Sequence, residues 1–157
     1  MRIALIPGSF DPFTNGHLDI VRRALCFMDK VVIGVGVNDA KHSLLSAKDR
    51  VEMIRSIFNG NERVEVQSYN CLTTDFANQV GAKFIVRGAR AIKDFEYEYT
   101  IADVNRKLTG IETIILVSEP ELSSISSSVV RELIKFGADI SAFVPKEVSL
   151  FLSNKGK

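Results

Sequence analysis

The feature that most constrains this sequence is the regular alternation of short apolar runs with segments of helical periodicity. The apolar runs have the length and β-branched character of buried strands. The segments between them repeat apolar residues at helical spacing, as Leu18, Val21 and Leu25 do. Such alternation predicts a parallel sheet with helices on both faces, joined by right-handed crossovers. We expect strands at Ile3–Ile6, Val31–Val37, Val64–Val66, Phe84–Val86 and Thr113–Val117.

Start and stop residues delimit the predicted helices. Ser46 and Asp49 resemble a capping box that opens a helix, and Gly81, Gly110 and Gly137 stand where helices would end. Further helices are predicted after Pro145 and over the segments Leu18–Met28, Ser46–Phe58, Leu72–Val80, Asp94–Leu108 and Ser127–Phe136. The pattern predicts one doubly wound, Rossmann-like α/β domain over residues 1–157, with a five-stranded sheet of order 3-2-1-4-5 and a flexible tail at 153–157.

Two chemically rich loops follow strands that this order makes neighbours. The first strand leads into PGSFDPFTNGH, residues 7–17, and the fourth leads into RGAR, residues 87–90. In doubly wound folds, ligands bind beyond the carboxyl ends of the strands where the strand order reverses, which here lies between the first and fourth strands. We therefore expect both loops to face one crevice that holds a ligand.

The turn between the first strand and the next helix has the composition of an anion site. Gly8 lets an anion approach the backbone, and Ser9 adds a hydroxyl donor. Thr14 or Asn15 can cap the helix, which places His17 in a first turn whose open N–H groups favour an anion. The spacing matches neither GxxxxGK(S/T) nor GxGxxG, and an ordinary Gly/Pro-rich turn with a surface histidine remains the alternative.

The overall charge excludes some partners. Twenty basic and nineteen acidic residues leave a formal net charge of +1, which is no electrostatic footprint for nucleic acid or an anionic membrane. Met1 leads straight into a strand without a signal peptide, and no apolar run reaches the length of a membrane span. Cys26 and Cys71 form no CxxC pair, so we expect buried free thiols in a cytoplasmic protein.

The chemistry-bearing stretches resemble one enzyme family. TNGH, residues 14–17, resembles the (T/H)xGH signature of the nucleotidylyltransferase superfamily, and PGSFDPFTNGHLDI resembles the bacterial phosphopantetheine adenylyltransferases. Three more stretches are similar to that family's pattern: VRGAR at residues 86–90, DFEYE at 94–98 and SSISSSVVRE at 123–132. The family transfers AMP from ATP to 4′-phosphopantetheine in coenzyme A biosynthesis, giving dephospho-coenzyme A and pyrophosphate.

The resemblance also implies roles for individual residues. His17, Lys41 and Arg90 match catalytic positions, Arg87 matches a residue that orients the acceptor phosphate, and Thr73 matches a contact to the pantetheine arm. The implied acceptor contacts are Ser9, Lys41, Thr73 and Arg87. The implied ATP contacts are Ser9, Phe10, His17, Gly88, Ala89, Arg90, Glu98, Leu122, Ser123, Ser124, Ile125, Ser126, Ser127 and Ser128.

Further expectations rest on the same resemblance. Mg²⁺ is expected on the triphosphate, held mainly by phosphates and water, so no protein ligand is named. A homohexamer and feedback binding of coenzyme A are also implied, with no nucleic acid or membrane partner.

Four alternatives remain at this stage. Two are other transferases of the superfamily, a nicotinamide-mononucleotide adenylyltransferase and a glycerol-phosphate cytidylyltransferase, and RGAR, DFEYE and ISSSVVRE argue against both. A class I tRNA synthetase fragment would need a KMSKS-like segment. A non-catalytic nucleotide sensor would not need His17 and Lys41 together.

Overall fold

The computed structural model describes residues 1–38, 40 and 42–155 of the chain. Within them the sheet contains five parallel strands in the order β3-β2-β1-β4-β5, which confirms the predicted topology. The strands are β1 Ile3–Gly8, β2 Lys30–Gly36, β3 Val64–Tyr69, β4 Phe84–Ala89 and β5 Glu112–Val117. The helices are α1 Asn15–Ala24, α2 Ala47–Ile57, α3 Thr73–Gln79, α4 Ile92–Thr109, α5 Ser127–Lys135 and α6 Lys146–Lys155, with a 3-10 turn, η1, at Pro120–Leu122.

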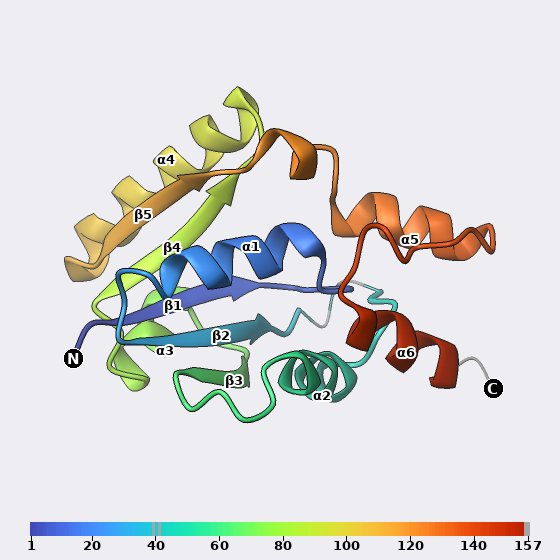
Figure 1. Ribbon diagram of the computed structural model, residues 1–157. Helices are drawn as coiled ribbons and strands as arrows, with labels where there is room; N and C mark the ends of the chain where they lie inside the picture. Colours follow the sequence, from blue (N-terminus) through green and yellow to red (C-terminus); the bar gives the residue numbers. More distant parts are fainter. Residues whose placement is uncertain (39, 41, 156–157) are drawn as a thin grey trace.

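Helices cover both faces of this sheet (Figure 1). Successive side chains of β1 point to opposite faces, so Ala4 and Ile6 enter one core cluster and Leu5 enters the other. The first cluster includes buried residues of α1, α2, α5 and α6, and the second includes Phe76 and Ala77 of α3. The edges of the sheet are β3 and β5. The central strand β1 is therefore covered on both faces of the sheet.

The helix signals in the sequence correspond to real caps. Ser46 and Asp49 form the predicted capping box of α2, with Asp49 N–H donating to Ser46 Oγ at 3.1 Å. Gly110 ends α4 in the left-handed conformation, with φ of 74°. Residues 153–155, which we expected in a tail, belong to α6, and Lys155 Nζ contacts the Asp49 carboxylate. Residues 156 and 157 lie outside the described part of the chain.

The expectation for the cysteines was wrong in one respect. Cys26 and Cys71 are free thiols, as expected, but both are exposed. Cys26 follows the end of α1, and Cys71 lies in the connection before α3. Neither residue belongs to the two core clusters, so apolar packing does not bury either thiol.

Candidate active site

The predicted crevice lies where β1 and β4 run side by side. Their register pairs Ala4 with Phe84 and Leu5 with Ile85. The turn after β1 and the loop after β4 therefore emerge together at the carboxyl edge of the sheet, near the first turns of α1 and α5 (Figure 1). The strand order reverses at this point, which is where doubly wound folds bind their ligands.

His17 is locked into the first turn of α1 by a capping box. Thr14 is the N-cap residue, and its side chain accepts from the His17 N–H at 3.4 Å. In return, the Thr14 backbone N–H donates to Nδ1 of His17 at 3.0 Å. Because a backbone N–H can only donate, Nδ1 is the acceptor and a neutral imidazole carries its proton on Nε2.

The surroundings of His17 favour that neutral form. Its ring centroid lies 5.0 Å from that of Phe10 and 5.3 Å from that of Phe13. Burial beside these rings, and then the charges of Arg87 and Arg90, lower the pKa of His17 to about 4. The side chain is thus a neutral hydrogen-bond donor with two fixed cations nearby.

The turn after β1 has an unusual backbone. Phe10 has a φ of +50°, and its ring folds back over Gly8, so a β-carbon at Gly8 would lie 2.8 Å from Phe10 Cζ. Asp11 is buried, and its carboxylate accepts from the Leu44 and Leu45 N–H groups at 2.7 and 2.9 Å. The same side chain therefore ties the β1–α1 turn to the segment between β2 and α2.

Arg87, near the end of β4, is held on two sides. Its Nε and Nη2 donate to the two carboxylate oxygens of Glu98 at 2.8 and 2.7 Å, and its Nη1 donates to the Pro7 carbonyl. Glu98 is buried and Arg87 is partly exposed, so a bidentate pair with a buried carboxylate joins β4 and α4. An arginine has five N–H donors, so two of them remain for an acceptor.

Arg90 joins the loop after β4 to the segment before α5. Its backbone N–H and Nε donate to Asp94 Oδ2 at 3.0 and 3.3 Å, and its Nη1 donates to the Ile125 carbonyl at 3.2 Å. Ser126 caps α5 by accepting from the Val129 N–H at 3.2 Å. The guanidinium of Arg90 is therefore fixed beside the N-terminal turn of a helix.

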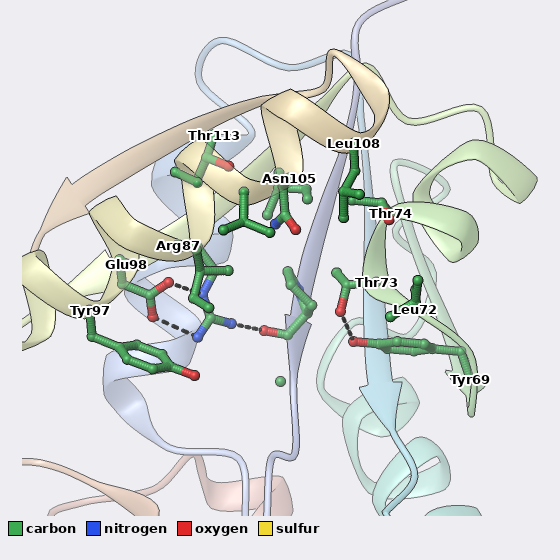
Figure 2. A pocket seen from close by; sticks show the side chains of 16 residues that line it. Tyr69, Leu72, Thr73, Thr74, Arg87, Tyr97, Glu98, Asn105, Leu108 and Thr113 are labelled. Atoms are coloured by element: carbon green, nitrogen blue, oxygen red, sulfur yellow. Dashed lines mark hydrogen bonds and ion pairs between the residues drawn. The ribbon is translucent and has the colours of Figure 1, made fainter.

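A pocket of about 310 Å³ opens beside Arg87. Figure 2 shows Arg87, Glu98 and Tyr97 at one end, Leu108 and Asn105 of α4 along one wall, and residues of α3 and its approach opposite. Thr73 accepts from or donates to the Tyr69 hydroxyl at 3.0 Å on that opposite wall. The lining of the pocket is mostly apolar, with the Arg87 guanidinium among its lining groups, which suits a molecule that joins an apolar part to an anion.

Three of the predicted site residues lie together in the structure. His17, Arg87 and Arg90 are close enough for both guanidinium charges to act on the imidazole. Thr73 lines the pocket, while Gly88 and Ala89 end β4 between the two arginines. Lys41 lies outside the described residues. Leu122 ends η1, and Ser123, Ser124, Ile125, Ser126, Ser127 and Ser128 lead from it into α5.

Glu98 differs from its expected surroundings. We expected Glu98 to contact the nucleotide, whereas in this structure both of its carboxylate oxygens accept from Arg87. Glu96, two residues before Glu98 on the same helix, is exposed. The contact between Glu98 and a nucleotide stays a prediction.

Sequence reasoning missed three residues that support the site. They are Asp11, which orders the neighbouring segment, Arg131, which donates to the Asp11 carbonyl at 2.8 Å, and Arg50, which donates to the Ser9 carbonyl at 2.6 Å. Arg50 could have been found, because it stands at an inward position of the α2 pattern Ala47-Arg50-Val51-Ile54. A charged residue at a core position is a signal of a specific partner.

Comparisons with known proteins agree with this geometry. The model of the cytidylyltransferase-like family matches residues 5–133. A phosphopantetheine adenylyltransferase from Bacteroides fragilis is 57% identical over 150 residues, which cover 96% of this chain and 100% of the relative. The proteins of the same name from Bacteroides thetaiotaomicron and Leuconostoc citreum are 56% and 50% identical, over 96% and 94% of this chain and 99% and 94% of their own lengths.

Proposed function

Because this chain belongs to the phosphopantetheine adenylyltransferase family, within the cytidylyltransferase-like proteins, we propose that it transfers AMP from ATP to 4′-phosphopantetheine. The products are dephospho-coenzyme A and pyrophosphate. The observation that carries this proposal is the convergence of a neutral histidine, two arginines and a helix N-terminus beside a mostly apolar pocket. Such a site can hold two phosphate-bearing substrates with their reacting groups at the carboxyl edge of one sheet.

In this proposal His17 stabilises the transition state. Its Nδ1 is occupied by the Thr14 N–H, so Nε2–H is the group that donates to an oxygen of the α-phosphate. The attacking phosphate is already an anion at neutral pH, so the reaction needs no general base. A neutral imidazole with a fixed Nε2 proton is suited to this donor role.

The ATP phosphates bind around Arg90 and the start of α5. Arg90 is prepositioned by Asp94 and by the Ile125 carbonyl, which directly precedes the Ser126 cap of α5. The open N–H groups of the α5 first turn are suited to phosphate oxygens. Ser126, Ser127 and Ser128 supply this turn, and Ser127 Oγ donates to the Pro12 carbonyl at 2.7 Å, which docks α5 on the β1–α1 turn. Remaining ATP contacts are assigned to Ser9, Phe10, His17, Gly88, Ala89, Glu98 and the segment 122–125.

The acceptor occupies the pocket beside Arg87. Its phosphate takes the free N–H groups of Arg87, and its pantetheine arm extends between α3 and α4 past Thr73. Ser9 and Lys41 complete the proposed acceptor contacts. Arg87 then holds the attacking oxygen at the border between the pocket and the ATP site.

Catalysis follows from position and charge. The acceptor phosphate attacks the α-phosphorus in line with the leaving pyrophosphate, and the site neutralises charge on the equatorial oxygens and the leaving group. Lys41, Arg87 and Arg90 supply the positive charge, and the neutral His17 donates a hydrogen bond. Binding both substrates at one sheet edge makes the reaction intramolecular in effect.

We propose that Mg²⁺ enters with ATP, as its phosphate complex. Among residues 1–38, 40 and 42–155, no three His, Cys, Asp or Glu side chains gather as a metal cage. No step above depends on a protein ligand to the ion. When bound, the ion would neutralise the triphosphate.

The remaining proposals concern the whole protein. We propose a single cytoplasmic domain that forms a homohexamer and binds coenzyme A as a feedback ligand, with no nucleic acid or membrane partner. No helix in the described part of the chain is long and apolar enough to cross a membrane.

Pyrophosphate release tests the reaction. Purified protein with ATP and Mg²⁺ would be offered 4′-phosphopantetheine, nicotinamide mononucleotide or glycerol 3-phosphate. Release with phosphopantetheine alone, with stoichiometric dephospho-coenzyme A, supports the proposal. No release with any acceptor, from folded protein that still binds ATP, would favour the nucleotide sensor instead.

A further inference from the structure

Arg50 carries a buried positive charge behind the β1–α1 turn. It lies in the first turn of α2 and is 3% exposed. Its Nη1 donates to the Ser9 carbonyl at 2.6 Å and to the Gly36 carbonyl at 3.2 Å. Its Nε is buried without an acceptor, and within the described residues no carboxylate pairs with it.

This placement is unfavourable for the protein alone. A buried charge needs a partner of opposite charge, and carbonyl dipoles compensate it only partly. The N-terminal turn of α2 adds to the penalty, because the helix dipole repels a cation there. Among the described residues this charge has no carboxylate partner, and the predicted polyanion site lies at the same carboxyl edge of β1 and β2.

The two carbonyls that Arg50 binds both border that site. Ser9 precedes Phe10, whose φ of +50° is uncommon for a bulky residue. In a trans peptide the C=O and the N–H point in opposite directions, so Arg50, by holding the Ser9 carbonyl, directs the Phe10 N–H away from α2. Among the described residues this N–H has no hydrogen-bond acceptor.

We propose that Arg50 is a positioning residue for the nucleotide. It fixes the Ser9–Phe10 peptide with the Phe10 N–H presented to a phosphate of ATP, and its buried charge offsets the negative charge of the triphosphate from behind the turn. This assignment rests on the proposed function, because it assumes a nucleotide at the β1–α1 turn. Arg50 itself touches no substrate.

Two substitutions separate geometry from charge. Arg50→Lys keeps the charge but cannot hold both carbonyls in the same way, and Arg50→Gln removes the charge. We expect the Kd for ATP to rise about tenfold in Arg50→Lys and about a hundredfold in Arg50→Gln, since hydrogen bonds to charged groups are among the stronger ones. The Kd would be measured by calorimetry without the acceptor, together with kcat and Tm.

Arg55 supplies the matched control. It lies on the same helix and its Nη2 donates to the Val66 carbonyl of β3 at 2.9 Å, away from the carboxyl edge of β1. Arg55→Lys and Arg55→Gln should leave the Kd for ATP unchanged. If the Arg50 variants show a lower Tm but an unchanged Kd for ATP, the proposal is wrong and Arg50 only stabilises the fold.

A measurement on the unaltered protein decides the case if the Arg50 variants do not fold. On addition of ATP, the Phe10 amide resonance should be among the most strongly shifted. A Phe10 amide that stays in place while the amides of residues 126–128 shift would overturn the proposal. Both measurements use ATP alone, so protein that binds ATP but transfers no AMP would contradict the proposed function without affecting this test.

Discussion

The Thr14 backbone N–H donates to Nδ1 of His17 at 3.0 Å, inside the capping box that starts α1. The bond makes a helix cap and a candidate catalytic residue the same structural unit. It also selects the imidazole tautomer, because Nδ1 is used as an acceptor and Nε2 keeps the proton. The local sequence that begins the helix therefore sets the chemistry of this candidate catalytic side chain.

Substitutions at His17 test this tautomer. A glutamine amide can place an N–H near the position of Nε2, whereas asparagine reproduces the position of Nδ1. We expect His17→Asn and His17→Ala to lower kcat by about a hundred- to a thousandfold, as expected when one transition-state donor is lost. His17→Gln should retain more activity than either. The Kd for ATP should change little in all three variants. An equal loss of kcat in His17→Gln and His17→Asn would contradict the assigned tautomer.

The lowered pKa of His17 predicts an acid-sensitive stability. The pKa is about 4 in the folded chain and 6.5 as the ordinary value, so between these limits the unfolded chain binds the proton more readily. The free energy of unfolding should therefore rise with pH from about 4 to about 6.5 and show no further His17 contribution above that range. The expected rise in the free energy of unfolding over this pH range is about 1–3 kcal/mol. Urea denaturation across this pH range should show a shallower rise for His17→Gln than for the wild type.

The Arg87–Glu98 pair predicts a selective effect on the acceptor. Arg87→Lys can keep one contact to Glu98 but loses the forked geometry that serves Glu98, Pro7 and a phosphate together. We expect the KM for phosphopantetheine to rise at least tenfold, with a smaller change in the KM for ATP. Arg106→Lys, at an exposed pair with Asp103 on the same helix as Glu98, is the control and should change neither. An equal rise in both KM values would place Arg87 outside the acceptor site.

Gly8→Ala should damage the turn after β1. The added β-carbon would lie 2.8 Å from Phe10 Cζ, and the Phe10 ring is itself packed against Phe13 and His17. We expect a loss of about 1–3 kcal/mol in the free energy of unfolding. Weaker ATP binding should accompany it, because displacement of the ring moves the Ser9–Phe10 backbone.

Gly36→Ala is the stability control for this substitution. Gly36 ends the neighbouring strand, and the nearest atom to a β-carbon there is 3.7 Å away. Thermal unfolding should therefore show a smaller loss at Gly36 than at Gly8. Equal losses would mean that the contact with Phe10 is not the cause.

The sequence by itself determined the elements and their order. Apolar periodicity located the strands and helices, Ser46 and Asp49 marked a capping box, and the strand order placed the loops of His17 and Arg87 in one crevice. These features are local, or follow from the rules that connect consecutive strands and helices. They can be read without knowledge of any contact between distant side chains.

Only the tertiary structure decided which partners those side chains have. Arg87 is paired with Glu98 across β4 and α4, and Arg50 is buried against the Ser9 carbonyl, 41 residues away in sequence. The exposure of Cys26 and Cys71 was likewise decided by the tertiary structure. Burial and long-range pairing depend on how the elements pack in three dimensions, and a charged side chain looks the same in sequence whether it meets water, a carboxylate or a carbonyl.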